Sequence, residues 1–387
     1  MNTVLPSIDS GSWMLDPHIT YLNHGSFGAR RVEIYEAQLK YKREIEKSPV
    51  DFLDRKRDLI NQARSVIADF VGADSQGFAF VENATTGIGC VVNSISFDPG
   101  DEILTTDHVY NGVRQLLLQH AKKNSLNYRE LKVPLPVLSA SDITTCISNA
   151  ISKQTKLLVV DHVASASSIL FPVKEIVDLC KEKGILLLID GAHTPGMIDL
   201  HIEELAPDWY VANLHKWVCA PLGAAFVWTN EKHRSMTHPM TISHWFGQGY
   251  TKEFDWQGTR DVSAWLAAAD AVRLGETVGW KRIRNHNHAL VTWMHSTLVE
   301  QLGVEPLSPI DGSMLGSMAT VMLPRICPQN SDDCLVLRDT IYEQFALEVP
   351  IFEFQGKGML RVSAQLYSKK VDIDLLLKAL SCVGIST

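Results

Sequence analysis

The amino-acid sequence predicts an α/β fold, with a mainly parallel central sheet sandwiched by helices and a smaller α+β domain towards the C-terminus. Between about residues 75 and 230, short apolar runs alternate with longer mixed segments, as repeated βαβ units require. After about residue 260 the pattern changes to long helical segments. A chain of 387 residues is long enough for two or three substructures and for a buried small-molecule site.

The expected elements follow in chain order. The head, through about residue 70, is mostly helical after the stretch TYLNHGSFG. Strands are expected in six apolar runs: GFAFV (77–81), DEILTT (101–106), TKLLVVDHV (155–163), GILLLIDGA (184–192), DWYVAN (208–213) and AAFVW (224–228). Helices are expected between them at 85–95, 111–123 and 173–184. Later come helices at 262–279, 284–303 and 334–345 and strands at 318–323 and 359–367.

These elements predict three parts. Residues 1–20 form an N-terminal segment that packs on one of the domains, and residues 21–260 form the large domain. Residues 261–387 form a connecting helix and the small C-terminal domain.

Composition excludes several classes of protein. Apolar residues make up 45% and charged residues 21%, the balance of a soluble globular protein. The net charge of −8 and the lack of a basic stripe argue against nucleic acid. No apolar run approaches the roughly 20 residues of a spanning helix, so we expect a cytoplasmic protein with no membrane partner. Seven scattered cysteines without zinc-type spacing indicate reduced thiols and no metal site.

Candidate site residues are the polar ones that follow each strand, because ligands of open α/β sheets bind outside the carboxyl ends of the strands. These segments are ENATTG (82–87), TTDHVYNG (105–112), DHVASASS (161–168), DGAH (190–193) and NLHKW (213–217). Two nucleotide-binding alternatives fail. The one Gly-Lys pair, Gly356-Lys357, lacks the rest of a phosphate-binding loop, and Gly87-x-Gly89 is followed by Val92 rather than the third glycine of a dinucleotide motif.

An acid and a lysine remain, Asp190 and Lys216, 26 residues apart at the ends of two successive strands. This pair suits pyridoxal 5′-phosphate, which needs a lysine to hold its aldehyde and an acid to keep the pyridine nitrogen protonated. The start of a helix at NATTGIG can bind the phosphate, although a plain helix cap explains it equally well. Tyr110 or His108 can stack on the ring. His193 and Ser165 are candidates for its hydroxyl, with buried structural roles as the alternative.

Seven stretches of the sequence resemble the isopenicillin N epimerase-like group of class V aminotransferases, which are fold-type I pyridoxal phosphate enzymes. They are YLNHGSFG, NATTG, DHVASAS, DGAHTPG, NLHKWVCAPLG, FDWQGTRD and LRVSAQLY. The resemblance covers roughly residues 18 to 368 and implies a large cofactor-binding domain and a homodimer with shared active sites.

The resemblance also implies a role for each matching residue. Lys216 would form the internal aldimine, Asp190 would face the pyridine nitrogen, and Tyr110 would stack on the ring. Arg361 would bind the substrate carboxylate with its bidentate fork. The residues expected to hold the phosphate are Ala84, Thr85 and His215, with Gly258 and Thr259 reaching across from the partner subunit. Asn23 and His24, with Trp245 and Phe246, are expected at the substrate entrance.

The predicted function is that of an enzyme acting on an α-amino acid through an external aldimine and a quinonoid, as an epimerase or racemase. Epimerisation needs an acid opposite Lys216, for which Tyr110 or a water held by His24 or His193 are candidates. The alternatives are a C–S β-lyase of the cysteine desulfhydrase kind and a class V aminotransferase. Persulfide transfer is not expected, because no cysteine lies between Cys334 and Arg361. A catalytically silent binding protein is the non-enzyme alternative, although such a protein has no need of Lys216.

Overall fold

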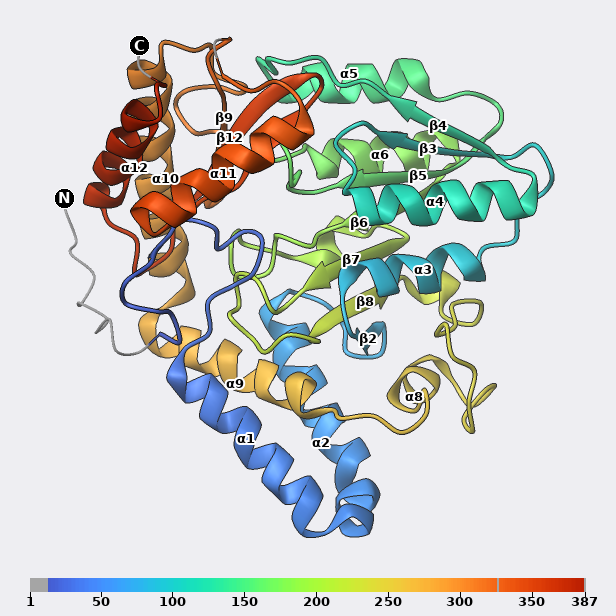
Figure 1. The fold of residues 1–387 in the computed structure, drawn as a ribbon. Coiled ribbons are helices and arrows are strands. Elements are labelled where there is room, and N and C mark those ends of the chain that lie inside the picture. Colours follow the sequence, from blue (N-terminus) through green and yellow to red (C-terminus); the bar gives the residue numbers. More distant parts are fainter. Residues whose placement is uncertain (1–12, 326, 386–387) are drawn as a thin grey trace.

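The computed structural model describes residues 13–325 and 327–385 of the chain (Figure 1). Most of the predicted N-terminal segment therefore lies outside the described residues. Within them, no helix is long and apolar enough to cross a membrane. No group of three or more His, Cys, Asp or Glu side chains in the same part of the chain could hold a metal ion.

A seven-stranded sheet, in the order β2-β8-β7-β6-β5-β3-β4, forms the centre of the larger unit. Its strands are β2 (Phe78–Val81), β3 (Glu102–Thr106), β4 (Asn127–Leu131), β5 (Thr155–Asp161), β6 (Leu186–Asp190), β7 (Trp209–Asn213) and β8 (Ala225–Thr229). Only β8 runs antiparallel to its neighbours, β2 and β7. The predicted mainly parallel sheet is thus confirmed, and each of the six apolar runs contains a strand of it.

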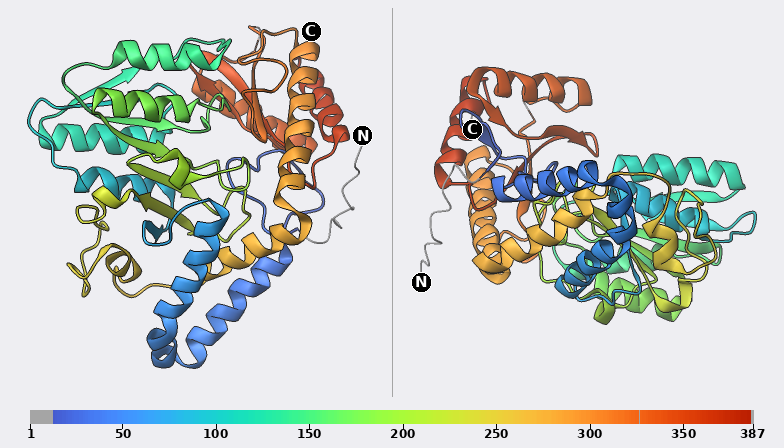
Figure 2. Two further views of the ribbon diagram at one scale, coloured as in Figure 1. Left: turned by 180° about the vertical axis from the view of Figure 1, so that it is seen from behind. Right: turned by 90° about the horizontal axis from the view of Figure 1, so that it is seen from below.

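Helices cover both faces of this sheet (Figure 1). On one face, α3 (Ala84–Ser94), α4 (Asn111–Asn124) and α8 (Tyr250–Asp255) share an apolar core with the strands. On the other face lie α2 (Pro49–Phe70), α5 (Ala140–Ala150), α6 (Val173–Lys183) and α9 (Ser263–Val278). The helix α1 (Val32–Lys47) forms a hairpin with α2 that projects beyond the sheet and packs on α9 (Figure 2). The short α7 (Ile202–Leu205) and the 3₁₀ helix η2 (Glu231–His233) lie in connections.

The smaller unit is built on a three-stranded antiparallel sheet in the order β11-β12-β9. Its strands are β9 (Met318–Met322), β11 (Ile351–Phe354) and β12 (Lys357–Ser363). The helices α10 (Trp280–Leu302), α11 (Ser331–Phe345) and α12 (Lys370–Cys382) supply the rest of its core. The strand β1 (Thr20–Tyr21) pairs with β10 (Leu347–Glu348), and Leu22 enters the same core. The start of the described chain is therefore part of the smaller unit.

Candidate active site

A cavity of about 610 Å³ opens at the carboxyl ends of the central strands, where the sequence predicts the site. Residues from both units form its wall. They are Gly25, Ser26, Phe27, Asn83, Ala84, Thr85, Thr86, Tyr110, Asp161, Ser165, Asp190, Ala192, His193, Asn213, His215, Lys216 and Arg361. The structure thus brings most of the predicted site residues together.

Lys216 lies in the loop between β7 and β8, partly buried in the wall of the cavity. Burial and the positive charge of Arg361 lower the pKa of its amine to about 7, while Asp190 and Asp161 oppose this shift. Its Nζ atom lies 3.1 Å from Nε2 of His193. The indole N–H of Trp217 donates to Nδ1 of His193 at 3.4 Å, so the proton of a neutral His193 belongs on Nε2. The Nε2–H group of His193 therefore points at Nζ of Lys216. It can donate to Nζ when the amine is uncharged and has a free lone pair.

Asp190 and Asp161 are two carboxyl groups in one buried site. They are directly paired in the register of β6 and β5, so both side chains lie on the same face of the sheet. The backbone N–H of Ala192 donates to Oδ1 of Asp190 at 2.9 Å, whereas Oδ2 of Asp161 has no hydrogen-bond partner among the described residues. Burial raises the pKa of Asp190 to about 6 and, with the Asp190 charge, raises that of Asp161 well above its usual range. Burial and the proximity of the two carboxyl groups thus favour a proton within this pair.

The first turn of α3 supplies donors to the cavity. Oδ1 of the N-cap residue Asn83 accepts the Thr86 N–H at 2.8 Å, and Oδ1 of Asn213 accepts the Ala84 N–H at 2.9 Å. Thr85 lies in the cavity wall in the same turn, where the first N–H groups of a helix can bind an anion. His215 lies beside it with Nδ1 3.1 Å from the Ala224 carbonyl. Burial and Lys216 lower the pKa of His215 to about 4, so its imidazole needs a bound anion to become protonated.

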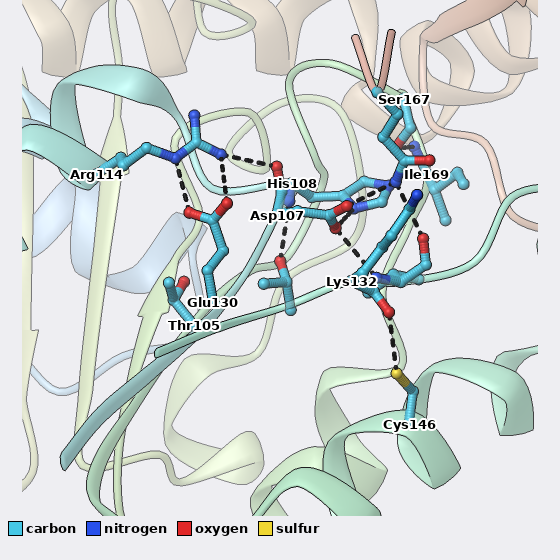
Figure 3. Close-up of polar contacts among 12 residues, drawn as sticks. Thr105, Asp107, His108, Arg114, Glu130, Lys132, Cys146, Ser167 and Ile169 are labelled. Carbon is cyan, nitrogen blue, oxygen red and sulfur yellow. Dashed lines mark hydrogen bonds and ion pairs between the residues drawn. The ribbon is translucent and has the colours of Figure 1, made fainter. Parts of the chain in front are cut away.

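Tyr110, rather than His108, lies in the wall, which also contains Phe27. Tyr110 is the N-cap residue of α4 and 54% exposed, and its ring packs over Gly112, where a Cβ would lie 2.8 Å from Cε1. His108 is buried outside the cavity, with Nδ1 3.0 Å from Oδ1 of Asp107 (Figure 3). Its ring packs edge-on against Phe171 and Phe354. His108 therefore cannot stack on a ligand in this cavity.

Arg361 projects from β12 of the smaller unit towards Lys216. One guanidinium nitrogen donates to the carbonyl and hydroxyl oxygens of Ser165, at 2.7 and 3.0 Å. The other terminal nitrogen donates to Oγ of Ser26 at 2.7 Å. Burial lowers the pKa of Arg361 to about 10, so it stays positively charged at neutral pH. The side chain is held in place before any anion binds.

Four predicted site residues do not line the cavity. Nδ2 of Asn23 donates to Oε1 of Glu348 at 3.3 Å, and His24 is completely buried beneath the Lys216 loop. Neither residue lies in the cavity wall, and their predicted contact with the substrate stays a prediction. Gly258 and Thr259 lie in the connection between α8 and α9, and their predicted role in a partner subunit stays a prediction.

Sequence reasoning placed Asn83, Asp161 and Asn213 in candidate segments but gave them no individual role, and it gave none to Ser26. Asp161 was recognisable as a polar residue at a strand end, but its pairing with Asp190 depends on the register of β5 and β6. Ser26 comes from a loop far away in sequence, within the stretch YLNHGSFG that resembles the family, and its contact with Arg361 depends on the tertiary fold.

Comparison with known proteins agrees with this geometry. The family model "Aminotransferase class-V" matches residues 33–376. A probable L-cysteine desulfhydrase of Arabidopsis thaliana is 30% identical over 95% of this chain and 83% of its own. Isopenicillin N epimerase of Amycolatopsis lactamdurans is 28% identical over 95% of both chains. A hercynylcysteine sulfoxide lyase of Schizosaccharomyces pombe is 21% identical over 95% of both chains.

Solved structures share the fold. A complex of the cystine C–S lyase C-DES with its product cysteine persulfide matches with a TM-score of 0.81 at 18% identity, over 96% of this chain and 99% of the other. A C-DES mutant with glycine covalently linked to its pyridoxal phosphate cofactor gives a TM-score of 0.82, also at 18% identity, over 94% of this chain and 97% of the other. The predicted fold and family resemblance are confirmed, and the chain belongs to the class V aminotransferase family.

Proposed function

We propose that this chain is a pyridoxal phosphate enzyme that removes the α-proton of an amino acid. Membership in the class V aminotransferase family supports the enzyme class and the cofactor. The observation that carries the proposal is that Lys216, Asp190 and Arg361 share one buried cavity. An amine, an acid and a carboxylate-binding guanidinium are the groups that this chemistry requires.

The residues of the cavity fit this cofactor. Its volume lies within the roughly 300–1,000 Å³ of small-molecule sites. The start of α3, with Thr85, suits a phosphate, and an anion there favours protonation of the neighbouring His215. Asp190 suits a protonated ring nitrogen. Ser165 presents its hydroxyl to the wall, and Tyr110 presents a ring.

Each side chain then has a defined task. When bound, pyridoxal phosphate supplies an aldehyde that captures amines and a ring that accepts the electron pair left by the α-proton. Arg361 orients the substrate carboxylate, and Lys216, with a pKa of about 7, takes the proton at Nζ. His193 steers Nζ through its Nε2 proton. Asp190 provides the negative charge that balances a protonated ring nitrogen.

We propose epimerisation as the outcome in which Tyr110 supplies the second acid. The structure reduces the candidates for that acid, because His24 lies outside the cavity and His193 faces Lys216. Tyr110 is the hydroxyl-bearing aromatic residue of the wall and is half exposed at its mouth. The similarity to isopenicillin N epimerases supports this outcome.

C–S β-lyase activity is the second candidate. It needs a base and a leaving group but no second acid, and the wall offers the base in Lys216. Relatives named L-cysteine desulfhydrase are equally similar to this chain. Incubation with L-amino acids and cysteine conjugates in deuterated water tests both candidates. α-Deuterated D-product without keto acid supports the epimerase, pyruvate without D-product supports the lyase, and amino-group transfer alone contradicts both.

We also propose that two copies of the chain form a homodimer with shared sites. Several apolar side chains near the cavity mouth are exposed, among them Phe27, Tyr110 and Leu222. Sedimentation at working concentration tests this proposal. A monomer that retains full activity contradicts it.

A further inference from the structure

The loop of residues 22–29 passes directly beneath Lys216. At Gly28 an added Cβ would lie 2.1 Å from the carbonyl oxygen of Lys216, so the two backbones are in contact there. Nε2 of His24 lies 3.1 Å from the same carbonyl oxygen. His24 is completely buried and does not reach the cavity. Its contact with the substrate site therefore runs through the backbone of Lys216.

The hydrogen bonds of His24 fix the position of its proton. The backbone N–H of Ala29 lies 3.2 Å from Nδ1 and can only donate, so Nδ1 is an acceptor. The hydroxyl of Tyr367, 2.9 Å from Nδ1, donates to it as well. Burial lowers the pKa of His24 to about 3, so the ring is neutral. The carbonyl oxygen of Lys216 can only accept, so the single ring proton lies on Nε2 and is donated to it, while the amide nitrogen of Gln365 makes a longer contact of 3.3 Å with Nε2.

The same loop holds the carboxylate-binding side of the site. Oγ of Ser26 accepts from Arg361 at 2.7 Å, and the N–H of Gly25 donates to Oγ of Ser363 at 3.0 Å. Lys216 belongs to the larger unit, whereas Arg361 and Ser363 belong to β12 of the smaller one. Through these hydrogen bonds, His24, Gly25 and Ser26 connect the Lys216 loop to the strand that carries Arg361.

We infer that His24 is a positioning residue. It holds the Lys216 backbone so that Nζ faces His193 and keeps its position relative to Arg361. The inference rests on the proposed role of Lys216 as the reacting amine. A small displacement of a reacting group lowers turnover on the order of 100-fold. Loss of the Nε2 hydrogen bond should therefore lower kcat strongly, with a smaller effect on KM.

Two substitutions separate this role from simple packing. His24→Gln carries an amide N–H that can reach the Nε2 position, and His24→Asn carries an amide oxygen that can replace Nδ1 as the acceptor for Ala29. We expect His24→Gln to retain most of kcat and His24→Asn to lose about 10- to 100-fold. If Asn retains more activity than Gln, or if both are impaired equally, the donor at Nε2 is not what matters.

A second readout needs neither cofactor nor turnover. The amine of Lys216 can be acylated at several pH values in the full chain after removal of bound cofactor, and quantified by peptide mapping. In the wild type and in His24→Gln, acylation of Lys216 should have its midpoint near pH 7. In His24→Asn the freed side chain reaches water, so the midpoint should rise. An unchanged midpoint in His24→Asn overturns the inference.

Nitrogen NMR of the wild type keeps the inference testable if the variants do not fold. The ring of His24 should be protonated at Nε2 and should not titrate between pH 5 and 8. Protonation at Nδ1, or titration in this range, contradicts the proposed donor. A wild type that binds no pyridoxal phosphate would refute the proposed function, and the labelling and NMR results would still decide the role of His24.

Discussion

Lys216 shows how the charges of individual residues set the chemistry of the site. Its amine is protonated below about pH 7 and neutral above it, because burial and Arg361 disfavour the charged form. Asp190 and Asp161 favour that form, since each places a carboxyl group near the amine. The balance keeps a nucleophile and base available at neutral pH.

This balance predicts a pH dependence. Acylation of Lys216 in the cofactor-free protein should increase through pH 7. In Asp190→Asn a negative charge that favours the protonated amine is removed, so the midpoint should move to lower pH. Peptide mapping measures it, with the exposed Lys174 of α6 as the internal control. An unchanged or higher midpoint in Asp190→Asn would contradict the coupling.

Arg361 predicts a change in substrate binding. Loss of a charge-assisted bidentate contact costs about 1.5 to 3 kcal/mol, so Arg361→Ala should raise KM for amino acids about 10- to 100-fold. Cofactor affinity should change far less. Steady-state kinetics and cofactor titration measure the two effects. Equal turnover of amino acids and their decarboxylated amines by the wild type would show that Arg361 does not bind the carboxylate.

The helix α3 makes a prediction about a secondary-structure element. Asn83→Ala removes the side-chain cap and should lower the free energy of unfolding by about 1 kcal/mol. Because the same turn presents Thr85 to the phosphate, pyridoxal phosphate affinity should fall as well. Asn330→Ala is the matched control, since Asn330 caps α11 in the same way, in the smaller unit and outside the cavity wall. Equal cofactor affinity in the two variants would rule out the phosphate role of α3.

Elements with strong patterns could be predicted from the sequence. The six apolar runs form strands because a parallel sheet buries them on both faces. β4 (NYREL) was not predicted, because this edge strand is half exposed and its polar residues hide the pattern. The polar residues at the ends of β5, β6 and β7 lie in the cavity wall, as predicted candidates for the site. The burial of His24 and the pairing of Asp161 with Asp190 could not be predicted, since both depend on tertiary contacts.

The two units of the molecule meet around the site. At the turn between β11 and β12, Nε2 of Gln355 donates to Oδ2 of Asp107 at 2.6 Å and to the carbonyl of Val133 at 3.1 Å. Asp107 also binds His108 (Figure 3). The ring of His108 packs edge-on against Phe354. This contact joins the strand of Arg361 to the loop that leads to Tyr110.

Gln355→Ala should therefore loosen the arrangement of the units. We expect a higher KM for amino acids, because Arg361 on β12 is displaced relative to the larger unit. Cofactor affinity should be unchanged. Thr340→Ala is the control, since that hydroxyl donates to the carbonyl oxygen of Val336 within α11 of the smaller unit, away from β12. If both variants change KM alike, the contact between the units has no part in substrate binding.

The identity of Lys216 as the cofactor-bearing residue is the central claim, because every other role in the cavity is defined relative to its amine. Borohydride reduction of the purified protein, followed by peptide mapping, tests it directly. The reduced cofactor should be found on Lys216, and Lys216→Ala should fold normally without incorporating any. Label on another lysine, or equal incorporation by Lys216→Ala, would contradict the account.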